Sequence, residues 1–401
     1  MSGLPSRRSL FGMAAAGGAA AVLTGCSTPM RGTAVPIDRT TQATVLGVPN
    51  ERFFTLYGTD PLEVEFAAAA DRLRRAQGLA PNAPLPEIQL LAVSGGGDNG
   101  AFGAGLLCGW SESGTRPVFE LVTGVSTGAL TAPFAYLGSS YDQQLRAVYT
   151  EITESDVLLK RHFTAALFDD AMSDNSPLFK TISRYLNDTM LAALATGYDE
   201  GRLLLIGTTD LDAQEPVMWN IGAIANSGHP RALDTIRRIM LASAAIPGAF
   251  PPTMFDVTLD GKPYQEMHVD GGAFAQAFLY PAALTRQRRA RMAGGQVVVP
   301  AVAYVIRNGR LDPEWATTER NTLSIAGRAI NTMIAASGYN DVLRMYYTTQ
   351  HDGIGFNLAY IGTDFTQKAP EPFDQGYMRA LFDYGYQRAL RGYDWSKAPP
   401  A

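Results

Sequence analysis

The segment at residues 121–130, Leu-Val-Thr-Gly-Val-Ser-Thr-Gly-Ala-Leu, constrains the fold more than any other part of the chain. An apolar run enters the pentapeptide Gly-Val-Ser-Thr-Gly at 124–128, and small residues typical of a helix follow it. The two glycines tolerate strained dihedral angles and let a helix pack closely. The sequence therefore predicts a buried strand, a sharp turn that exposes the Ser126 hydroxyl, and then a helix.

A second apolar run, residues 88–93, leads into three consecutive glycines, Gly95, Gly96 and Gly97, and a helical pattern begins near Gly100. Glycine amides beside a helix N-terminus can bind a phosphate or an oxyanion, because no side chain covers them and the helix dipole favours negative charge. No Gly-Lys-Ser/Thr follows, which excludes a Walker-type nucleotide loop.

A third segment places a carboxylate at the end of a short strand pattern. Asp270 precedes Gly271 and Gly272, which allow close approach of another chain segment. Upstream of it, the pair Asp260-Gly261 in the middle of 257–267 favours a two-residue hairpin turn.

Hydrophobic patterning indicates the remaining elements. Buried strands are predicted at 88–93, 119–123, 202–207 and 297–306. Helices are predicted at 61–77, 100–112, 127–137, 141–152, 231–242, 322–350 and 376–390. The alternation of strands and helices predicts a three-layer α/β/α domain with a mainly parallel central sheet. Ser126 and the glycine loop both follow strands, at the carboxyl ends where such sheets form binding crevices.

The glycine loop, the serine turn and the Asp-Gly-Gly turn, in this order, resemble the patatin-like phospholipase family over residues 86–395. Residues 208–211 and 242–252 also look like blocks of that family. The resemblance implies a patatin-like α/β/α fold and a Ser126–Asp270 dyad that needs no histidine. Asp270 would take the serine proton, and Ser126 would attack an ester carbonyl. The amides of Gly95–Gly97 would bind the oxyanion, and water would then cleave the acyl-serine.

Two positions depart from the pattern of the family. Asn99 stands where the family usually has a basic residue, just before the glycine that closes its first loop. Gln276 stands where the family often has asparagine, a few residues beyond Asp-Gly-Gly. The first departure weakens the expected hold of this loop on a charged intermediate or anionic head group. Neither departure removes a reacting group.

The histidines decide between a triad and a dyad. A Ser-His-Asp triad in the usual α/β-hydrolase chain order needs a histidine after the acid, and only His351 follows Asp270. His351 is predicted to lie in an exposed helix-end turn. His268 lies two residues before Asp270 and thus on the same strand face, where it could orient Asp270, tune its pKa, act as a base, or be a polar strand residue. Apolar surroundings are expected to raise the low pKa of the Asp270 carboxyl.

Three other polar residues are predicted to have structural roles. Asp210 is expected to cap a turn, Ser243 to pack at a helix end, and Cys108 to be a buried, inert thiol. The acyl chain of a substrate is expected to contact Phe102, Phe274 and Phe278, which are close in sequence to the catalytic motifs.

The N-terminus looks like a targeting segment. Twin arginines at 7–8 precede an apolar stretch that ends in Leu-Thr-Gly-Cys26, which resembles a Tat-type signal followed by a bacterial lipobox. We therefore expect a signal peptide at 1–25, a lipid anchor on Cys26, a tether at 26–60 and a catalytic domain at 61–401. The expected location is the bacterial cell envelope, with the protein anchored to a membrane.

Composition and charge exclude some functions. Of 401 residues, 46% are hydrophobic, enough for a large core, and the net charge of −5 without a basic run argues against nucleic-acid binding. Neither a cofactor nor a metal is expected. Three functions remain open: a lipid acyl hydrolase or carboxylesterase, an acyltransferase with the same acyl-serine chemistry, and a non-catalytic envelope lipoprotein that keeps the fold.

Overall fold

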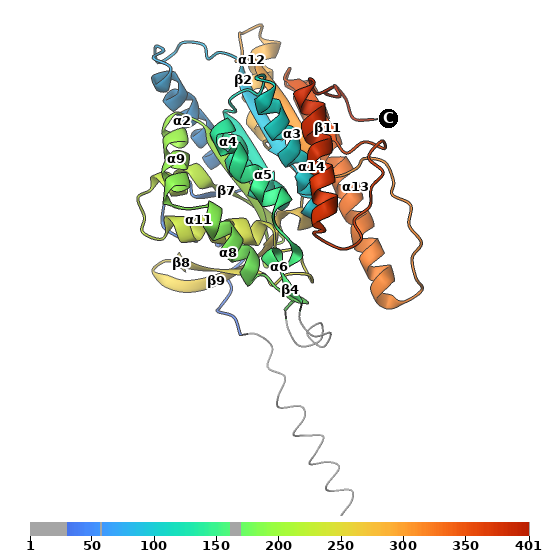
Figure 1. Cartoon of the computed structure of the whole chain (residues 1–401). Helices are drawn as coiled ribbons and strands as arrows, with labels where there is room; N and C mark the ends of the chain where they lie inside the picture. Colours follow the sequence, from blue (N-terminus) through green and yellow to red (C-terminus); the bar gives the residue numbers. More distant parts are fainter. Residues whose placement is uncertain (1–29, 57, 161–169, 401) are drawn as a thin grey trace, which may run out of the picture.

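The computed structural model describes residues 30–400 except 57 and 161–169 (Figure 1). Its strands are β1 Arg52–Phe54, β2 Ile88–Val93, β3 Leu121–Val125, β4 Leu159–Lys160, β5 Ser173–Asp174, β6 Leu203–Asp210, β7 Glu215–Asn220, β8 Thr253–Leu259, β9 Lys262–Asp270, β10 Ala301–Arg307 and β11 Gly355–Tyr360. Its helices are α2 Asp60–Ala76, α3 Gly100–Glu112, α4 Thr127–Leu137, α5 Asp142–Thr150, α6 Glu154–Val157, α8 Ser176–Tyr185, α9 Asp188–Asp199, α10 Ile221–Asn226, α11 Ala232–Ser243, α12 Arg286–Ala293, α13 Thr322–His351 and α14 Gln375–Leu390. Short 3-10 turns lie at Thr40–Gln42, Gly97–Asn99, Ser139–Tyr141, Gly271–Ala273 and Ala282–Thr285.

The central sheet runs in the order β1-β7-β6-β3-β2-β10-β11. Neighbours from β6 to β11 are parallel, whereas β7 is antiparallel to β6 and β1 is antiparallel to β7. The hairpin of β8 and β9 joins the sheet through β9, which is antiparallel to β6. The predicted three-layer α/β/α fold with a mainly parallel sheet is confirmed.

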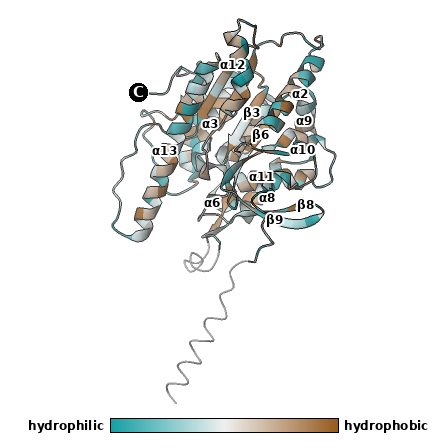
Figure 2. Cartoon of the chain, turned by 180° about the vertical axis from the view of Figure 1, so that it is seen from behind, coloured by the Kyte–Doolittle hydropathy of each residue, from teal (hydrophilic) through white to brown (hydrophobic). Residues whose placement is uncertain are grey.

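Side chains of the sheet alternate between two cores. Along β2, Leu91 and Val93 face a core that includes α3, α4, α11 and α14, whereas Leu90 and Ala92 face a core that includes α2 and the second half of α13. This period of two is that of a strand with both faces covered. Figure 1 shows α3, α4, α5 and α14 in front of the sheet, and Figure 2 shows hydrophobic colour on the central strands between the helices.

The hairpin predicted from Asp260-Gly261 is confirmed. Leu259 pairs with Lys262 across this two-residue turn. Both turn residues have positive φ angles, +50° at Asp260 and +75° at Gly261, as a type I′ turn requires. The hairpin delivers Asp270 to the sheet at the end of β9.

The described part of the segment predicted as a tether, residues 26–60, packs against the rest of the protein. Arg31 forms a 2.7 Å ion pair with Asp212, Thr44 bridges Thr258 of β8, and β1 pairs with β7. The physical reason is that apolar residues of this segment are buried in the two cores. The expected signal peptide and Cys26 lie outside the described residues. Within residues 30–400 as described, no helix is long and apolar enough to cross a bilayer.

Candidate active site

Ser126 occupies the predicted turn between β3 and α4. Its φ angle is +57°, a region that few residues other than glycine adopt, and the residue is 7% exposed. A Cβ on Gly128 would lie 2.1 Å from the carbonyl oxygen of Val93, so only glycine allows α4 to approach β2 this closely. The serine therefore sits at the N-terminus of α4 in a strained turn, as expected for an activated nucleophile.

The register of β6 brings Asp270 beside this serine. One edge of β6 is taken by β7, so β3 and β9 share the other edge. Val125 pairs with Gly207, and Asp270 pairs with the next residue, Thr208. The carboxyl ends of β3 and β9 therefore meet at one point on β6. Ser126 and Asp270, far apart in the chain, therefore lie close together at that junction.

The environment of Asp270 suits a general base. Its Oδ1 atom accepts a hydrogen bond from the amide of Gly272 at 2.7 Å, and its Oδ2 atom is buried without a hydrogen-bond partner among the described residues. Burial raises the pKa of Asp270 to about 7, although the nearby Ser126 hydroxyl, which is not within hydrogen-bonding geometry, and the hydrogen bond from the Gly272 amide act to lower it. Asp270 as a whole is 4% exposed. A carboxylate with a free acceptor and a pKa near neutrality can take a proton from serine.

The glycine loop lies against the serine, but its three amides differ. Gly95 approaches so closely that a Cβ there would lie 3.0 Å from Cβ of Ser126. The Gly95 amide donates to the carbonyl of Gln276 at 2.9 Å and is therefore occupied. No hydrogen bond within the described residues uses the amides of Gly96 or Gly97. Among the described residues, the amides of Gly96 and Gly97 are thus free to donate to a ligand, whereas the amide of Gly95 is used to fix the loop.

Arg307 lies behind this loop and was not singled out from the sequence. It ends β10, which pairs with β2, and its buried guanidinium donates from Nη1 to the carbonyl of Gly95 at 3.2 Å. The hydroxyl of Ser94 donates to the same carbonyl at 2.8 Å. The Gly95 carbonyl and the Gly96 amide belong to one peptide group, so a cation on the carbonyl strengthens the amide as a donor. Burial lowers the pKa of Arg307, and Asp341 opposes that change. The sequence does hold one signal that could have identified Arg307, namely a basic residue directly after a predicted buried strand.

Two residues outside the expected set hold Ser126 and the Asp-Gly-Gly turn in place. Ser243, at the end of α11, accepts from the amide of Ser126 at 3.0 Å and donates to the carbonyl of Gly207 at 2.6 Å. It therefore positions the serine, beyond the packing role predicted for it. Gln276 donates to the carbonyl of Gly272 at 2.9 Å and joins the Asp-Gly-Gly turn to the glycine loop.

Asn99, which stands at the position where a basic residue was expected, accepts a hydrogen bond from the hydroxyl of Tyr377 at 2.6 Å and so contacts α14.

The histidines do not complete a triad. His268 is fully buried, with Nδ1 2.9 Å from Thr208 Oγ1 and Nε2 3.2 Å from Glu266 Oε2, and no hydrogen bond within the described residues joins it to Asp270. His351 is exposed at the end of α13, as predicted.

The region around His268 also contains a group of possible metal ligands. Possible ligand atoms of Asp210, Glu266 and His268 lie within 4.8 Å of one another. However, the buried guanidinium of Arg52 already pairs with Glu266 at 2.5 Å and supplies the positive charge there. Asp210 accepts from the amide of Asp212 at 2.9 Å, which fits the turn-capping role predicted for it. This group of residues is best explained as a structural ion-pair network.

Cys108 lies apart from the reacting groups. Its thiol is buried, and burial raises its pKa to about 12. A thiol with such a pKa is unreactive at neutral pH, in agreement with the inert role predicted for it.

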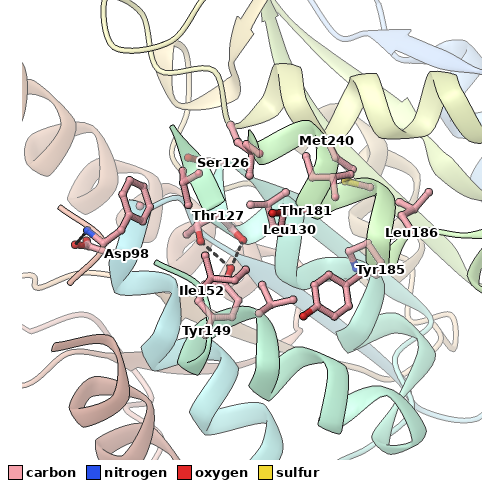
Figure 3. A pocket seen from close by; sticks show the side chains of 18 of the residues that line it. Asp98, Ser126, Thr127, Leu130, Tyr149, Ile152, Thr181, Tyr185, Leu186 and Met240 are labelled. Atoms are coloured by element: carbon pink, nitrogen blue, oxygen red, sulfur yellow. Dashed lines mark hydrogen bonds between the residues drawn. The ribbon is translucent and has the colours of Figure 1, made fainter. Parts of the chain in front are cut away.

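An apolar cavity of about 100 Å³ extends from Ser126 between α4, α8 and α11 (Figure 3). Leu130 and Ile152 line the middle part of the cavity. On the side away from the serine, its wall is formed by Tyr185, Leu186 and Met240. Such a cavity can hold an acyl chain whose ester carbon rests at Ser126.

The structure brings none of the three expected acyl-contact residues to this cavity. Phe102 is fully buried in the core, where its ring packs against Tyr384 and Tyr393. Phe274 and Phe278 line a second cavity, which Ser126 does not line. Proximity in sequence to the catalytic motifs therefore did not place these rings beside the serine.

Residues 91–283 match the family model described as Patatin-like phospholipase. No curated protein matches the chain. Among solved structures, VipD from Legionella pneumophila is similar at 13% identity and a TM-score of 0.32, with 77% of this chain and 68% of VipD covered. Human GIVD cytosolic phospholipase A2 is 11% identical with a TM-score of 0.30, and the match covers 82% of this chain but 54% of the human protein.

Proposed function

Because the chain belongs to the patatin-like phospholipase family through residues 91–283, we propose that it is a lipid acyl hydrolase whose catalytic dyad is Ser126 and Asp270. The observation that carries the proposal is the junction on β6, where the unpartnered, buried Oδ2 of Asp270 lies at the strained serine turn. Family membership supports lipid ester hydrolysis, and the geometry supports these two residues as the reacting pair.

The geometry supports a two-step mechanism. Asp270 accepts the proton of Ser126 as Oγ bonds to the ester carbonyl carbon, and the electron pair of the C=O double bond moves to its oxygen. The amides of Gly96 and Gly97 stabilise that oxyanion. The intermediate collapses, the alcohol leaves with the proton from Asp270, and an acyl-serine remains. Water then gives a proton to Asp270 and cleaves the acyl-serine, which releases the fatty acid and restores the serine hydroxyl.

The apolar cavity at Ser126 is proposed to hold the acyl chain, which a substitution at its far side can test. Leu186→Trp adds bulk where the chain would end. Each methylene excluded from the cavity forfeits ~0.8 kcal/mol, so exclusion of a few methylenes lowers kcat/KM for a palmitoyl ester about tenfold or more. Activity on the matching acetyl ester should change little. The measurement is kcat/KM on both esters. The products are also separated, so that hydrolysis to free fatty acid is distinguished from acyl transfer to an added alcohol.

The matched control is Phe274→Asp, at a 41% exposed position in the second cavity. This substitution should change kcat/KM for the palmitoyl and acetyl esters by the same factor. If Phe274→Asp selectively impairs palmitoyl hydrolysis and Leu186→Trp does not, the acyl chain binds in the second cavity. If neither the natural chain nor the variants release fatty acid from any ester, the proposed function is wrong.

The raised pKa of Asp270 predicts the pH dependence of hydrolysis. Below a pH of about 7 the carboxyl holds its proton and cannot accept one from Ser126. We expect kcat/KM to fall about tenfold per pH unit below that point and to level off above it. Circular dichroism over the same range separates this titration from unfolding. An ascending limb centred near the pKa of an ordinary exposed aspartate would contradict a buried base.

Arg307 is proposed to be a positioning residue that acts through the Gly95–Gly96 peptide group. In Arg307→Gln we expect kcat to fall roughly tenfold to a hundredfold with little change in KM, because the oxyanion forms only in the transition state. Affinity for a trifluoromethyl ketone, which forms an oxyanion on addition of serine, should fall in parallel with kcat. Arg307→Lys should recover part of both losses.

Arg310→Gln is the matched control, because Arg310 donates to the carbonyl of Gly362, away from the glycine loop. It should leave kcat and inhibitor affinity unchanged. A lower melting temperature in Arg307→Gln with normal kcat and normal inhibitor binding would show that Arg307 only supports the fold.

A further inference from the structure

The first half of α13 presents apolar side chains to solvent. The helical spacing of residues such as Ile330 and Met333 favours burial against a core, yet Ile325 is 51%, Ile330 46% and Met333 62% exposed. Only the second half of the helix joins a core, for example through Met345. Figure 1 shows the first half of α13 projecting beyond the body of the protein.

Apolar side chains gather on one side of this segment. At about 100° per residue, Ile325, Ile330 and Met333 fall on one half of the helix, with Ala326 and Ala329. All five of these residues are exposed.

The opposite half of the same segment is more polar and carries Ser324, Arg328 and Asn331, with Ala335 at its middle. Arg328 is the one charged residue between 322 and 338, and it donates to the carbonyl of Glu314 in the preceding loop. The polar half therefore holds one hydrogen bond to the preceding loop through Arg328, while the other half presents Ile325, Ile330 and Met333 to solvent. A soluble protein normally buries the apolar side of a helix, so this face fits an apolar partner.

The position of the first described residues indicates which partner that is. The first described residues lie against the β8–β9 hairpin, where the Gly32 amide donates to Gln265 at 2.7 Å. This hairpin and the first half of α13 lie at the same end of the molecule in both views (Figures 1 and 2). The lipid anchor proposed on Cys26 is four residues before Met30, a reach of at most ~14 Å along an extended chain. A bilayer that holds the anchor therefore lies at this end.

Part of the wall of the proposed acyl site lies at the same end of the molecule. Helix α6, which supplies Val157 to the cavity at Ser126, lies at this end of the molecule (Figure 1). Trp315, in the loop before α13, is 84% exposed. Tryptophan is the side chain most typical of the boundary between lipid and water.

We propose that the outward face of α13, formed by Ile325, Ile330 and Met333, docks onto the surface of the lipid bilayer together with Trp315 of the preceding loop. The face enters the boundary between headgroups and acyl chains while the polar half points away from the lipid. This places α6, which lines the cavity at Ser126 through Val157, on the side of the protein that faces the lipid. The inference rests on the proposed lipid substrate and on the anchor at Cys26, and it adds a second, non-covalent contact with the membrane.

The test uses the full chain with Cys26→Ser, so that the anchor does not mask the contact. Binding to vesicles of phosphatidylethanolamine and phosphatidylglycerol is measured by co-sedimentation. A variant with Ile325→Glu, Ile330→Glu and Met333→Glu should bind about tenfold or more weakly, because charged groups cannot enter the apolar boundary.

The matched control places the same three charges on the opposite half of the same helical segment, as Ser324→Glu, Asn331→Glu and Ala335→Glu. Asn331 and Ala335 are exposed and Ser324 is partly exposed, so glutamate side chains at these positions can reach water. The control has the same net charge as the apolar-face variant and should bind vesicles as the parent does.

Activity separates this proposal from the proposed function. The apolar-face variant should hydrolyse a soluble acetyl ester normally and vesicle phospholipid poorly. Loss of all ester hydrolysis with intact vesicle binding would contradict the dyad and leave the docking face standing. Equal vesicle binding by the parent and both variants would overturn the docking proposal. So would a change from dimer to monomer in the apolar-face variant with vesicle binding unchanged, because the face would then join two copies of the chain.

Discussion

Ser126→Ala is expected to lower kcat/KM for ester hydrolysis by roughly 10⁴-fold or more, because no acyl-enzyme can form without the hydroxyl oxygen. The fold should persist. The substitution removes one atom, keeps the amide that donates to Ser243, and leaves the strained backbone of the turn unchanged. Kinetics on a soluble ester, with the melting temperature measured on the same sample, test both parts.

Ser113→Ala is the matched control for that variant. Ser113 follows α3, and its hydroxyl hydrogen-bonds local groups, the carbonyl of Trp110 and the hydroxyl of Thr115. It should keep full activity. A folded Ser126→Ala protein that retains more than a small fraction of the parent activity would show that another group attacks the ester.

Asp270→Asn is expected to lower kcat/KM by roughly 10³-fold or more, since the amide has the shape of the carboxyl but cannot accept the serine proton. His351→Ala should keep most of its activity, because His351 is exposed at the end of α13. Loss of activity in His351→Ala together with normal activity in Asp270→Asn would contradict the dyad.

Asp270→Asn is also expected to change stability in a pH-dependent way. The pKa of Asp270 is about 7 in the folded protein, above its usual value of 3.8. Folding therefore favours the protonated form, and stability falls as pH rises from the lower value to the upper one. Asparagine does not ionise, so the variant should be more stable than the parent above pH 7 and similar at low pH. Denaturant unfolding at several pH values measures this difference.

Local sequence signals were sufficient for the elements that carry the motifs. Helices α3 and α4 begin and end where the patterns place them, because glycine-rich turns mark their starts and their apolar residues recur with helical periodicity. The hairpin follows from Asp260-Gly261, since few other dipeptides tolerate positive φ at both positions. The serine turn, the glycine loop and the Asp-Gly-Gly turn could also be found locally.

Features that depend on register between distant segments could not be predicted in this way. β1 is three residues long, and only its pairing with β7 shows that residues 52–54 belong to the sheet. Arg307 reaches Gly95 because β10 lies beside β2, a neighbour relation that no local pattern encodes. The helical spacing in α13 indicates one apolar face, but it does not tell whether protein covers that face.

The residues expected to contact the acyl chain were also chosen from local sequence alone, and tertiary packing places them elsewhere. Phe102 lies in the first turn of α3, close in sequence to the glycine loop, but the direction of that turn sends its ring into the core. The cavity at Ser126 is instead lined from α8 and α11, whose residues come together only through tertiary packing.

The most direct test of the account is to identify the atom that an ester-mimicking inhibitor labels. A long-chain alkyl fluorophosphonate, incubated with the full chain, should form one stable adduct on the Ser126 oxygen, and activity should fall in proportion to the labelled fraction. Peptide mass spectrometry locates the adduct, and Asp270→Asn should label far more slowly. Complete inactivation with the adduct on a different residue, or full labelling of Ser126 with activity retained, would contradict the assignment of Ser126 as the nucleophile.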